Sequence, residues 1–396
     1  MPPEVLKLRE LTGAQRQSAR ARAAAALRDG EFVVLPCETL YGVAARADLP
    51  APRLAAFRTL TRGSENPTSP FTWHAPSSES VIEGLGIVDP LHARALRRLS
   101  PGPVRFVISL PPAALPAALA RVQLPPRIAD DGVGVHVRIP DEEFTRGVLE
   151  ESGVAVVIDR LPKSMGDAVT APGLVPGVAM VIDTGPTRLR KGSTSIRLGL
   201  DSGGRGFWEV IAAGALEPRI IERRIRRTVL FVCTGNTCRS PMAESIATHI
   251  ASQRPRGIGG IPTVFASAGI AASEGEPTSS ENVAALAALG VSQLPHHARG
   301  LTPTLAHEAD VVYAMTKGHL RAVRAFAPSA NVLLLDPGGS DIPDPVGSGA
   351  EVYAHTARLL DSFIRLRLGE LESPIQPLAQ AAEVTSTSTP PPGTSS

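Results

Sequence analysis

The stretch TVLFVCTGNTCRSPMAESIATHIAS, residues 228–252, constrains the fold of this chain more than any other. It opens with an apolar run, TVLFVC, which is typical of a buried strand. The following loop holds Gly235 and Asn236, the residue types that most readily adopt positive φ. An amphipathic segment then begins at Pro241, a residue suited to the first turn of a helix. The stretch predicts a strand that turns directly into a helix, as in parallel α/β sheets.

The same alternation continues to residue 372. Three further strands are predicted in TVFASAG, ADVVYAM and NVLLL, and three further helices in SSENVAALAALG, KGHLRAVRAF and AEVYAHTARLLDSFIRLRLGELE. Four strands separated by helices predict a small doubly wound four-stranded parallel sheet, an α/β domain over residues 228–372. Residues 373–396 are rich in Ser, Thr and Pro without periodicity, so we expect a disordered tail.

Residues 1–217 predict a second α/β domain, because a chain of 396 residues favours two globular units over one. Strands are predicted at 31–36, 105–110, 132–140, 154–159 and 179–183, with helices at 14–29, 53–62, 89–99 and 141–151. Between the domains, residues 218–227 are strongly basic. We interpret them as a solvated linker, with a phosphate- or RNA-binding arm as the alternative.

Composition sets limits on location and partners. The net charge of +2 is too balanced to indicate nucleic acid or membrane by itself. No apolar run approaches the roughly 20 residues needed to span a bilayer, and the N-terminus lacks the apolar core of a secretion signal. Three cysteines do not make a disulfide framework. We therefore expect a cytoplasmic protein with no membrane partner.

The loop of residues 233–240 carries the chemistry. Its backbone N–H groups and the positive end of the next helix can form a cradle for an anion. Cys233 lies at the mouth of that cradle, where the N–H groups and the cation of Arg239 would stabilise its thiolate. Arg239 can hold two phosphate oxygens with one planar fork, and Ser240 can donate to the sulfur. The pattern suits covalent phosphoryl transfer to sulfur; a buried structural cysteine is the alternative.

Such a reaction also needs a general acid, because the leaving group must be protonated as its bond to phosphorus breaks. Asp344, followed by Pro345 and by two nearby glycines, lies on a loop of the required kind. Asp341 is the rival candidate for the acid. The non-catalytic alternative is that Asp344 is an ordinary turn aspartate. The same carboxylate would then deprotonate the water that hydrolyses the cysteinyl-phosphate.

Residues 228–371 resemble the low-molecular-weight protein tyrosine phosphatase family. The resemblance rests on VLFVCTGNTCRSPMAE, SAG (267–269), HHARGLT (296–302), ADVVYAM (309–315) and the Asp-Pro of IPDPVGSGAEVY. It implies that Cys233 is the nucleophile, that Arg239 binds phosphate and that Asp344 is the acid. It also implies a phosphate-binding loop in which Asn236 pins the backbone and Ser240 supports the thiolate. The other members of that loop are Thr234, Gly235, Thr237 and Cys238.

The resemblance bears on substrate and regulation as well. CTGNTCRSPMAE is most similar to the bacterial protein arginine phosphatase branch, where threonine at the position of Thr234 favours phosphoarginine. Members of the family commonly have an aromatic residue after this Asp-Pro, whereas this chain has Val346. The difference weakens the case for phosphotyrosine more than the case for phosphoarginine, because aromatic rings pack well on one another. A phosphorylated protein is the expected substrate, with both phospho-residues open and no cofactor or metal. For Cys238 the family implies a reversible disulfide with Cys233; a small packed residue is the alternative.

In the first domain, LPCETLYGVAA (35–45) resembles the PTETVYGL signature of the YrdC-type threonylcarbamoyl-AMP synthase family. Further similar pieces lie at 100–108, 133–140, 181–186, 192–198 and 212–218. The resemblance implies an α/β fold with a basic groove that uses ATP, L-threonine and bicarbonate, with or without Mg²⁺, to make the precursor of a tRNA modification. It also implies tRNA or double-stranded RNA as a partner.

The first domain departs from that family at several positions. Cys37 replaces the first threonine of the signature, Leu60 replaces a lysine, and VIDRLPKS replaces a Ser-Ala-Asn nucleotide motif. The remaining groove candidates are Thr39, Arg62, Arg138, Ser193 and Arg197. Two interpretations stay open: an active synthase, or a non-catalytic nucleotide- or RNA-binding module that targets or scaffolds the phosphatase.

Overall fold

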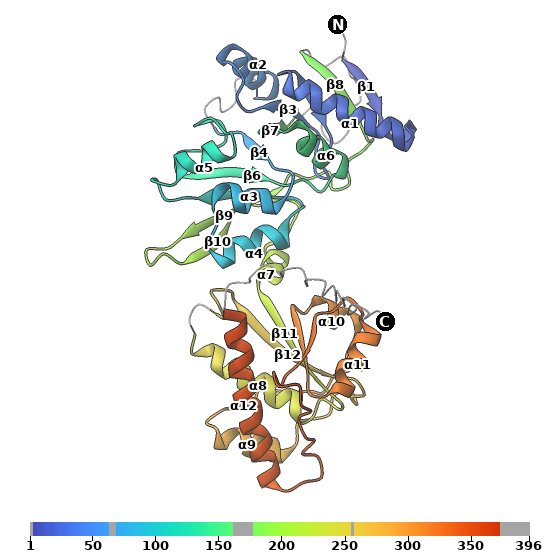
Figure 1. Cartoon of the computed structure of the whole chain (residues 1–396), viewed down its shortest axis with the longest axis vertical. Helices are drawn as coiled ribbons and strands as arrows, with labels where there is room; N and C mark the ends of the chain where they lie inside the picture. Colours follow the sequence, from blue (N-terminus) through green and yellow to red (C-terminus); the bar gives the residue numbers. More distant parts are fainter. Residues whose placement is uncertain (1–2, 63–68, 161–176, 255–256, 373–396) are drawn as a thin grey trace, which may run out of the picture. The chain divides into compact units, whose positions relative to one another are not determined.

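The chain was analysed as a computed structural model that describes residues 3–62, 69–160, 177–254 and 257–372 (Figure 1). Its contacts divide the chain into two units. The first comprises Met1–Arg227 with Gly260–Pro262, and the second comprises Thr228–Gly259 with Thr263–Ser396. The tail predicted at 373–396 lies outside the described residues. No helix in the described ranges is long and apolar enough to cross a membrane.

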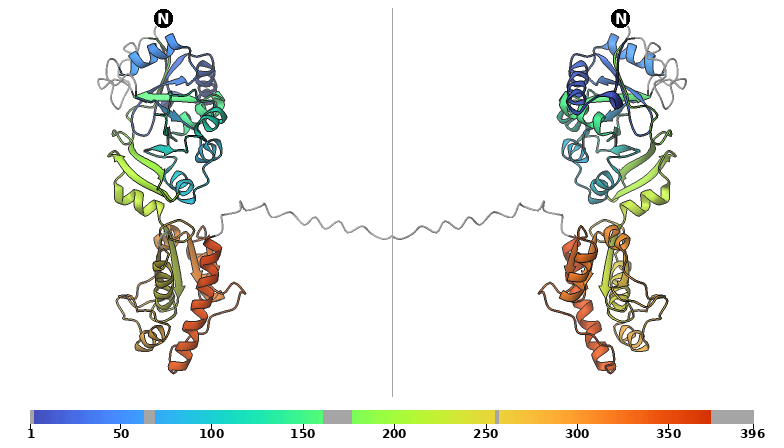
Figure 2. Two further views of the ribbon diagram at one scale, coloured as in Figure 1. Left: turned by 90° about the vertical axis from the view of Figure 1, so that its left-hand side faces the viewer. Right: turned by 90° about the vertical axis from the view of Figure 1, so that its right-hand side faces the viewer.

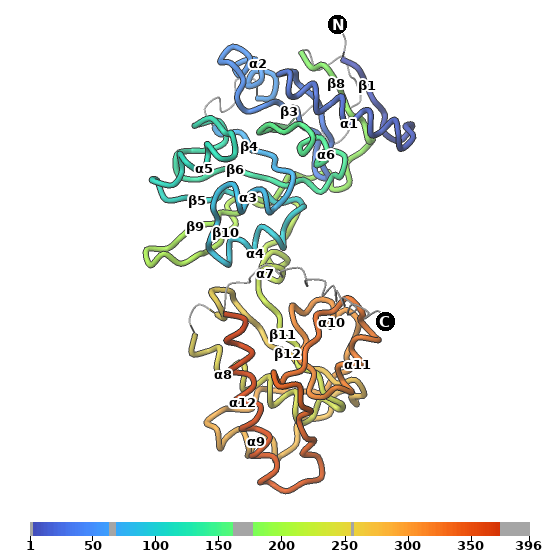
Figure 3. Tube along the Cα trace, viewed as in Figure 1, coloured from blue at the N-terminus to red at the C-terminus, as the bar shows by residue number. Residues whose placement is uncertain are grey.

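The N-terminal unit is built on one mixed sheet, whose described strands follow the order β1-β8-β2-β3-β7-β4-β6-β5-β9-β10. Strands far apart in sequence lie side by side in it, as β1 and β8 do (Figure 3). The strands are β1 (Glu4–Lys7), β2 (Phe32–Leu35), β3 (Gly42–Arg46), β4 (Thr72–His74), β5 (Val104–Ser109), β6 (Gly134–Arg138), β7 (Val156–Arg160), β8 (Val178–Asp183), β9 (Thr194–Leu200) and β10 (Gly206–Ala212).

Helices cover both faces of this sheet. They are α1 (Gly13–Arg28), α2 (Ala51–Arg62), α3 (Ser78–Leu85), α4 (Pro90–Leu99), α5 (Leu115–Arg121), α6 (Glu143–Ser152) and α7 (Pro218–Ile225), with a 3₁₀ turn, η1, at Leu8–Glu10. Strand β2 shows why its sequence is apolar throughout: Val33 and Leu35 pack against α1 and α6, whereas Phe32 and Val34 pack into the core on the opposite face. A strand buried on both faces cannot alternate polar and apolar residues.

The five strands and four helices predicted for this unit are confirmed as β2, β5, β6, β7, β8, α1, α2, α4 and α6. The segment 218–227 differs from the solvated linker expected. It contains α7, whose Ile221 and Ile225 are buried in the N-terminal core. These two apolar residues are four positions apart and share one helix face, which leaves the arginines between them for the other face. The high basic content concealed this pattern.

The C-terminal unit contains a four-stranded sheet of order β12-β11-β13-β14, in which β11, β13 and β14 pair in parallel. This confirms the small doubly wound sheet. Its strands are β11 (Arg227–Cys233), β12 (Thr263–Gly269), β13 (Val311–Ala314) and β14 (Val332–Leu334). Its helices are α8 (Arg239–Ser252), α9 (Ser280–Ala288), α10 (Pro303–Glu308), α11 (Lys317–Phe326) and α12 (Ala350–Glu372).

Two separate cores sandwich this sheet. One contains residues of α8, α9 and α12, and the other contains residues of α10 and α11. Figure 2 shows the long α12 running beside the sheet. Because the strand order reverses between β11 and β13, the connections that leave these two strands diverge to opposite faces. Their carboxyl ends therefore flank a crevice, the usual place for a ligand in such sheets.

Gly269, the last residue of β12, lies against the backbone that follows β11. A Cβ atom on Gly269 would come within 2.4 Å of the Thr234 carbonyl oxygen and 2.9 Å of the Asn236 nitrogen. Both atoms belong to the backbone, so neither can rotate away. The residue at this position must be glycine for β12 to approach the loop so closely.

We predict that Gly269→Ala lowers the free energy of unfolding by about 1–3 kcal/mol, the usual cost of forcing an extra carbon into a packed site. Urea denaturation of the full chain measures this. Gly369→Ala is the matched control, because a Cβ there meets nothing within 4 Å and lies in α12. Equal stability of the Gly269→Ala variant and the parent would contradict the close approach.

Candidate active site

The loop Cys233–Cys238 connects β11 to α8 and lies at the crevice beside β13. Cys233 ends the strand, and Arg239 begins the helix. Asn236 adopts the left-handed backbone conformation, with φ of 58°, which asparagine tolerates better than most residues. This turn bends the backbone of the loop round to the first turn of α8.

The loop's carbonyl groups bond outward, to its surroundings. Ile270 and Ala271, which follow β12, donate their N–H groups to the carbonyls of Cys233 and Thr234 at 3.0 Å. The remaining outward bonds run from His296 Nε2 to Asn236 O, from Ser279 N and Thr278 Oγ1 to Thr237 O, and from Asn282 Nδ2 to Cys238 O. A loop whose carbonyls are held outward can turn its N–H groups inward, which is the geometry of an anion-binding nest.

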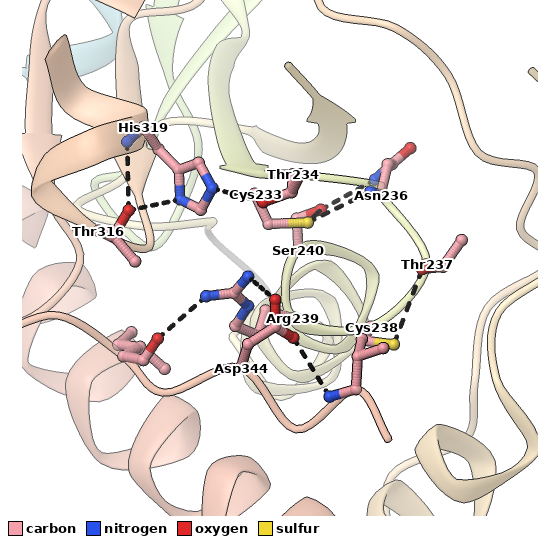
Figure 4. A network of polar contacts seen from close by, with 12 residues as sticks. Cys233, Thr234, Asn236, Thr237, Cys238, Arg239, Ser240, Thr316, His319 and Asp344 are labelled. Atoms are coloured by element: carbon pink, nitrogen blue, oxygen red, sulfur yellow. Dashed lines mark hydrogen bonds and ion pairs between the residues drawn. The ribbon is translucent and has the colours of Figure 1, made fainter. Parts of the chain in front are cut away.

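Hydrogen-bond donors surround the sulfur of Cys233 (Figure 4). The Asn236 backbone nitrogen lies 3.3 Å from Sγ, and Ser240 Oγ lies 2.9 Å from it. Ser240 Oγ accepts a hydrogen bond of 2.9 Å from Asn236 Nδ2, so its own proton is available to the sulfur. The competing acceptor, the carbonyl of Ala268, is 3.5 Å from that hydroxyl. The side chains of Cys233, Asn236 and Ser240 are all buried.

Asn236 also ties the loop to the neighbouring segments. Its Nδ2 donates to Ser267 Oγ at 2.9 Å, and its Oδ1 accepts the backbone N–H of Arg299 at 2.9 Å. Ser267 in turn donates to Glu244 at 2.6 Å. Every polar atom of this fully buried amide is thus engaged, which fixes its orientation.

Arg239 and Asp344 form an ion pair next to the loop (Figure 4). The Arg239 side chain is 5% exposed, whereas that of Asp344 is 46% exposed. A second nitrogen of Arg239 donates to the carbonyl of Ile342 at 3.0 Å. Asp341, the rival acid, accepts the backbone N–H of Lys317 at 2.7 Å instead. The structure therefore brings Asp344, and not Asp341, to the cation of the loop.

His319 was not among the predicted site residues, although it touches the loop. It lies in the first turn of α11, directly after β13, and its Nε2 is 2.9 Å from Thr234 Oγ1. Its Nδ1 is 3.0 Å from Thr316 Oγ1. Burial, followed by the charge of Arg239, lowers the pKa of His319 to about 4. The sequence places His319 shortly after a predicted strand, but only the pairing of β13 with β11 brings it to the loop.

Cys238 directs its sulfur to a different environment from that of Cys233. Its Sγ lies 3.4 Å from Tyr353 Oη and 3.7 Å from the hydroxyls of Thr237 and Ser279. Burial, together with the Cys238 contact, raises the pKa of Tyr353. Both cysteines are free thiols, and their disulfide stays a prediction.

The N-terminal unit contains a cavity of about 790 Å³. Four of the five predicted groove residues line it: Thr39, Arg62, Arg138 and Ser193. Arg197 is not among the lining residues, and its guanidinium pairs with Glu209. Sequence reasoning missed further lining residues: His74, Arg105, His136 and Ser195. They come from neighbouring strands of the sheet, whose pairing a single sequence does not reveal.

The cations of this cavity differ in their availability. Arg62 pairs with Asp159, also donates to Ser69 and lies over the ring of Phe71. One nitrogen of Arg138 donates at 2.7 Å to both Glu38 and Thr39. Its Nε is buried and makes no hydrogen bond within the described residues. Both arginines are therefore paired with an acid of their own chain, Arg62 with Asp159 and Arg138 with Glu38, and Arg138 also keeps one buried donor without a partner among the described residues.

Two other residues of the cavity are uncharged. Burial raises the pKa of the Cys37 thiol to about 12, which agrees with a packed residue rather than a nucleophile. Burial, followed by the charge of Arg138, lowers the pKa of His74 to about 3. Across the described part of the chain, no cluster of His, Cys, Asp and Glu side chains could hold a metal ion.

Comparison with known proteins separates the two halves of the chain. Residues 228–374 match the family model described as low molecular weight phosphotyrosine protein phosphatase. Residues 25–202 match the model of the Sua5, YciO and YrdC family, described as telomere recombination. Residues 203–227, which include β10 and α7, lie between the two matches.

Characterised relatives align with the second half. A low molecular weight protein-tyrosine-phosphatase of Streptomyces coelicolor is 35% identical over 145 residues, which are 34% of this chain and 87% of that protein. A protein-arginine-phosphatase of Bacillus subtilis is 34% identical over 143 residues, covering 35% and 91%. A solved structure, the YwlE arginine phosphatase from Geobacillus stearothermophilus, is 32% identical with a TM-score of 0.34, covering 37% of this chain and 93% of that one. The chain therefore belongs to the low molecular weight phosphotyrosine protein phosphatase family and is a protein phosphatase that also carries a Sua5/YrdC domain.

Proposed function

We propose that the C-terminal unit hydrolyses phosphoarginine in proteins through a cysteinyl-phosphate intermediate. The observation that carries this proposal is the sulfur of Cys233 within a loop whose carbonyls bond outward. Cys233 Sγ attacks phosphorus, so that an S–P bond forms as the P–N bond to the guanidine breaks. The electron pair of that bond stays on the leaving nitrogen, which receives a proton from the carboxyl group of Asp344.

The second half of the reaction uses the same groups. The carboxylate of Asp344 takes a proton from water, whose oxygen attacks phosphorus as the S–P bond breaks. Phosphate leaves, and the thiolate is restored. Arg239 and the inward N–H groups hold the equatorial oxygens throughout, where negative charge is greatest. Ser240, by donating to the sulfur, stabilises it as the leaving group of this step.

The rim of the site supports phosphoarginine over phosphotyrosine. Exposed residues beside the nucleophile and the acid include Thr234, Ile270 and Val346, the last two being 41% and 62% exposed. Ile270 and Val346 are tied to the loop and the acid, since Ile270 donates to Cys233 O and Val346 donates to Asp344. None of these three offers a ring to stack on a phenol. The aliphatic part of an arginine side chain packs on such side chains without needing a ring to stack on.

The proposed roles predict a graded series of variants. Cys233→Ser removes the sulfur nucleophile and is expected to abolish turnover of phosphopeptides. Asp344→Asn is expected to slow turnover by about 10²- to 10⁴-fold, the usual contribution of a general acid, and most for poor leaving groups. Phosphate release measured with substrates of graded leaving-group pKa tests both.

Asp341→Asn is the control for the acid, because the amide oxygen can still accept the N–H of Lys317. Its turnover should stay close to that of the parent. Should Asp341→Asn and Asp344→Asn exchange these phenotypes, the assignment of the acid is wrong. Full activity in Cys233→Ser would remove the covalent mechanism altogether.

Thr234→Ile tests the substrate class. Isoleucine replaces the hydroxyl with a methylene and adds one further carbon next to the nucleophile. This change should lower kcat/KM for a phosphoarginine peptide relative to the matching phosphotyrosine peptide by about tenfold, the scale on which one methylene discriminates in a pocket. The two peptides share one sequence apart from the phospho-residue. An unchanged ratio would contradict the phosphoarginine preference.

The N-terminal cavity supports a second function. We propose that it binds a nucleotide or another phosphate-bearing ligand through Arg138, Arg105 and Ser193. The departures from the family signature at Cys37 and Leu60 favour a binding module over an active synthase, because nucleotide chemistry needs the hydroxyl and the cation that these positions lack. Synthesis of threonylcarbamoyl-AMP, and tRNA or double-stranded RNA as the partner, remain the alternatives.

We predict that the full chain binds ATP without releasing pyrophosphate when threonine and bicarbonate are present. Arg105→Gln should weaken ATP binding, since its guanidinium lines the cavity and its Nε contacts only Ser195 within the described residues. Calorimetry and a pyrophosphate assay measure the two quantities. Pyrophosphate release that depends on both threonine and bicarbonate would establish the synthase instead.

A further inference from the structure

His319 links the loop of the active site to the start of α11. Its side chain is buried, and its two ring nitrogens reach hydroxyls on opposite sides, Thr316 Oγ1 at 3.0 Å and Thr234 Oγ1 at 2.9 Å (Figure 4). The mechanism proposed above uses neither His319 nor Thr316. A buried ring that bridges the rim of the site to a helix cap therefore needs a separate explanation.

The outer end of this bridge is fixed by the helix. Thr316 is the N-cap of α11, and its Oγ1 accepts the backbone N–H of His319 at 3.2 Å. That hydrogen bond holds the hydroxyl in place, as N-cap bonds do. Because Nδ1 contacts the same oxygen, the imidazole ring cannot rotate without losing it. The position of Nε2 follows from the cap.

The inner end of the bridge restricts Thr234. A threonine side chain has a single free rotation, about χ1. When Nε2 of His319 holds Oγ1, that rotation is fixed, and the place of the methyl group is fixed with it. Thr234 is exposed at the rim and directly follows Cys233. The orientation of its hydroxyl and methyl groups therefore decides what the substrate meets beside the nucleophile.

We propose that His319 is a positioning residue that sets the substrate preference of the Cys233 site by holding the Thr234 side chain in one rotamer. This inference rests on the phosphoarginine preference proposed above. On this proposal, the substrate preference depends on three hydrogen-bonded residues, Thr316, His319 and Thr234, and not on Thr234 alone.

The charge state of the ring agrees with this role. The charged groups that act on it within the described residues are Arg239, Asp344 and Asp341, of which the first opposes protonation and the other two favour it. Burial and Arg239 prevail, and the pKa of His319 is about 4. At neutral pH the ring is uncharged, so one nitrogen donates and the other accepts. The ring is therefore a neutral hydrogen-bonding group and does not supply a second positive charge to the phosphate.

Two amide substitutions separate the ends of the bridge. His319→Gln places an amide group near the position of Nε2 and can keep the bond to Thr234. His319→Asn places it near Nδ1 and keeps only the side facing Thr316. The amide offers both a donor and an acceptor, so either direction of the original bond can be reproduced.

The readout is the ratio of kcat/KM for the phosphoarginine and phosphotyrosine forms of one peptide, measured on the full chain. His319→Asn should lower this ratio about three- to tenfold, the worth of one net hydrogen bond, with the larger loss on the phosphoarginine peptide. His319→Gln should restore most of the ratio. Thr234→Val, which removes the same bond from its other end, should shift the ratio in the same direction.

The double variant Thr234→Val/His319→Asn completes a cycle. Its ratio should match that of either single variant, since both remove one shared contact. An unchanged ratio in His319→Asn, an equal loss on both substrates, or full additivity in the double variant would each overturn the proposal.

Thr234→Ile separates the failure of this inference from failure of the proposed function. If Thr234→Ile leaves the ratio unchanged, the phosphoarginine preference itself is wrong. If Thr234→Ile shifts the ratio and His319→Asn does not, only the role of His319 is wrong.

Discussion

The chemistry of the C-terminal unit depends on where the carbonyls of one short loop point. Segments after β12, the start of α9 and the residue His296 all donate to the loop between Cys233 and Cys238 from outside. With these oxygens held outward, the backbone N–H of Asn236 already faces the sulfur, at 3.3 Å, before an anion arrives, which is how a preorganised site avoids a reorganisation cost. Two residues make this loop conformation possible. Gly269 lets β12 approach the loop closely, and Asn236 adopts the left-handed backbone conformation of the turn, which most other residues would resist.

The candidate catalytic loop could be predicted from the sequence because its residues and the elements that position them lie in one continuous stretch. Cys233, Asn236, Arg239 and Ser240 lie within eight consecutive positions, so strand, turn and helix bring them together without any knowledge of the rest. Asp344 came from reaction chemistry and from the family, and its contact with Arg239 is a long-range feature. His319 escaped notice because its relevance follows from the pairing of β11 with β13, which only the folded sheet shows.

The N-terminal unit was harder to predict for the same reason. Its cavity collects side chains from separate strands of a mixed sheet, and the partners that occupy them are equally distant in sequence. The pairing of Arg62 with Asp159 joins residues nearly a hundred positions apart and changes what Arg62 can offer to a ligand. The helix α7 shows a related limit, since two buried isoleucines among arginines looked like a solvated linker. In the first case an acid far away in the sequence pairs with a candidate binding cation, and in the second two apolar residues, not the arginines, decide where the segment packs.

The ion pair between Arg239 and Asp344 has a consequence for the end of the catalytic cycle. A carboxylate anchored in the same chain is present at a high effective concentration and competes with any free anion for the guanidinium. On the proposed mechanism, Asp344 ends the cycle protonated, so its ion pair with Arg239 re-forms only after that proton has been lost to solvent. The resting enzyme then holds Arg239 with an internal anion, which any free phosphate has to displace.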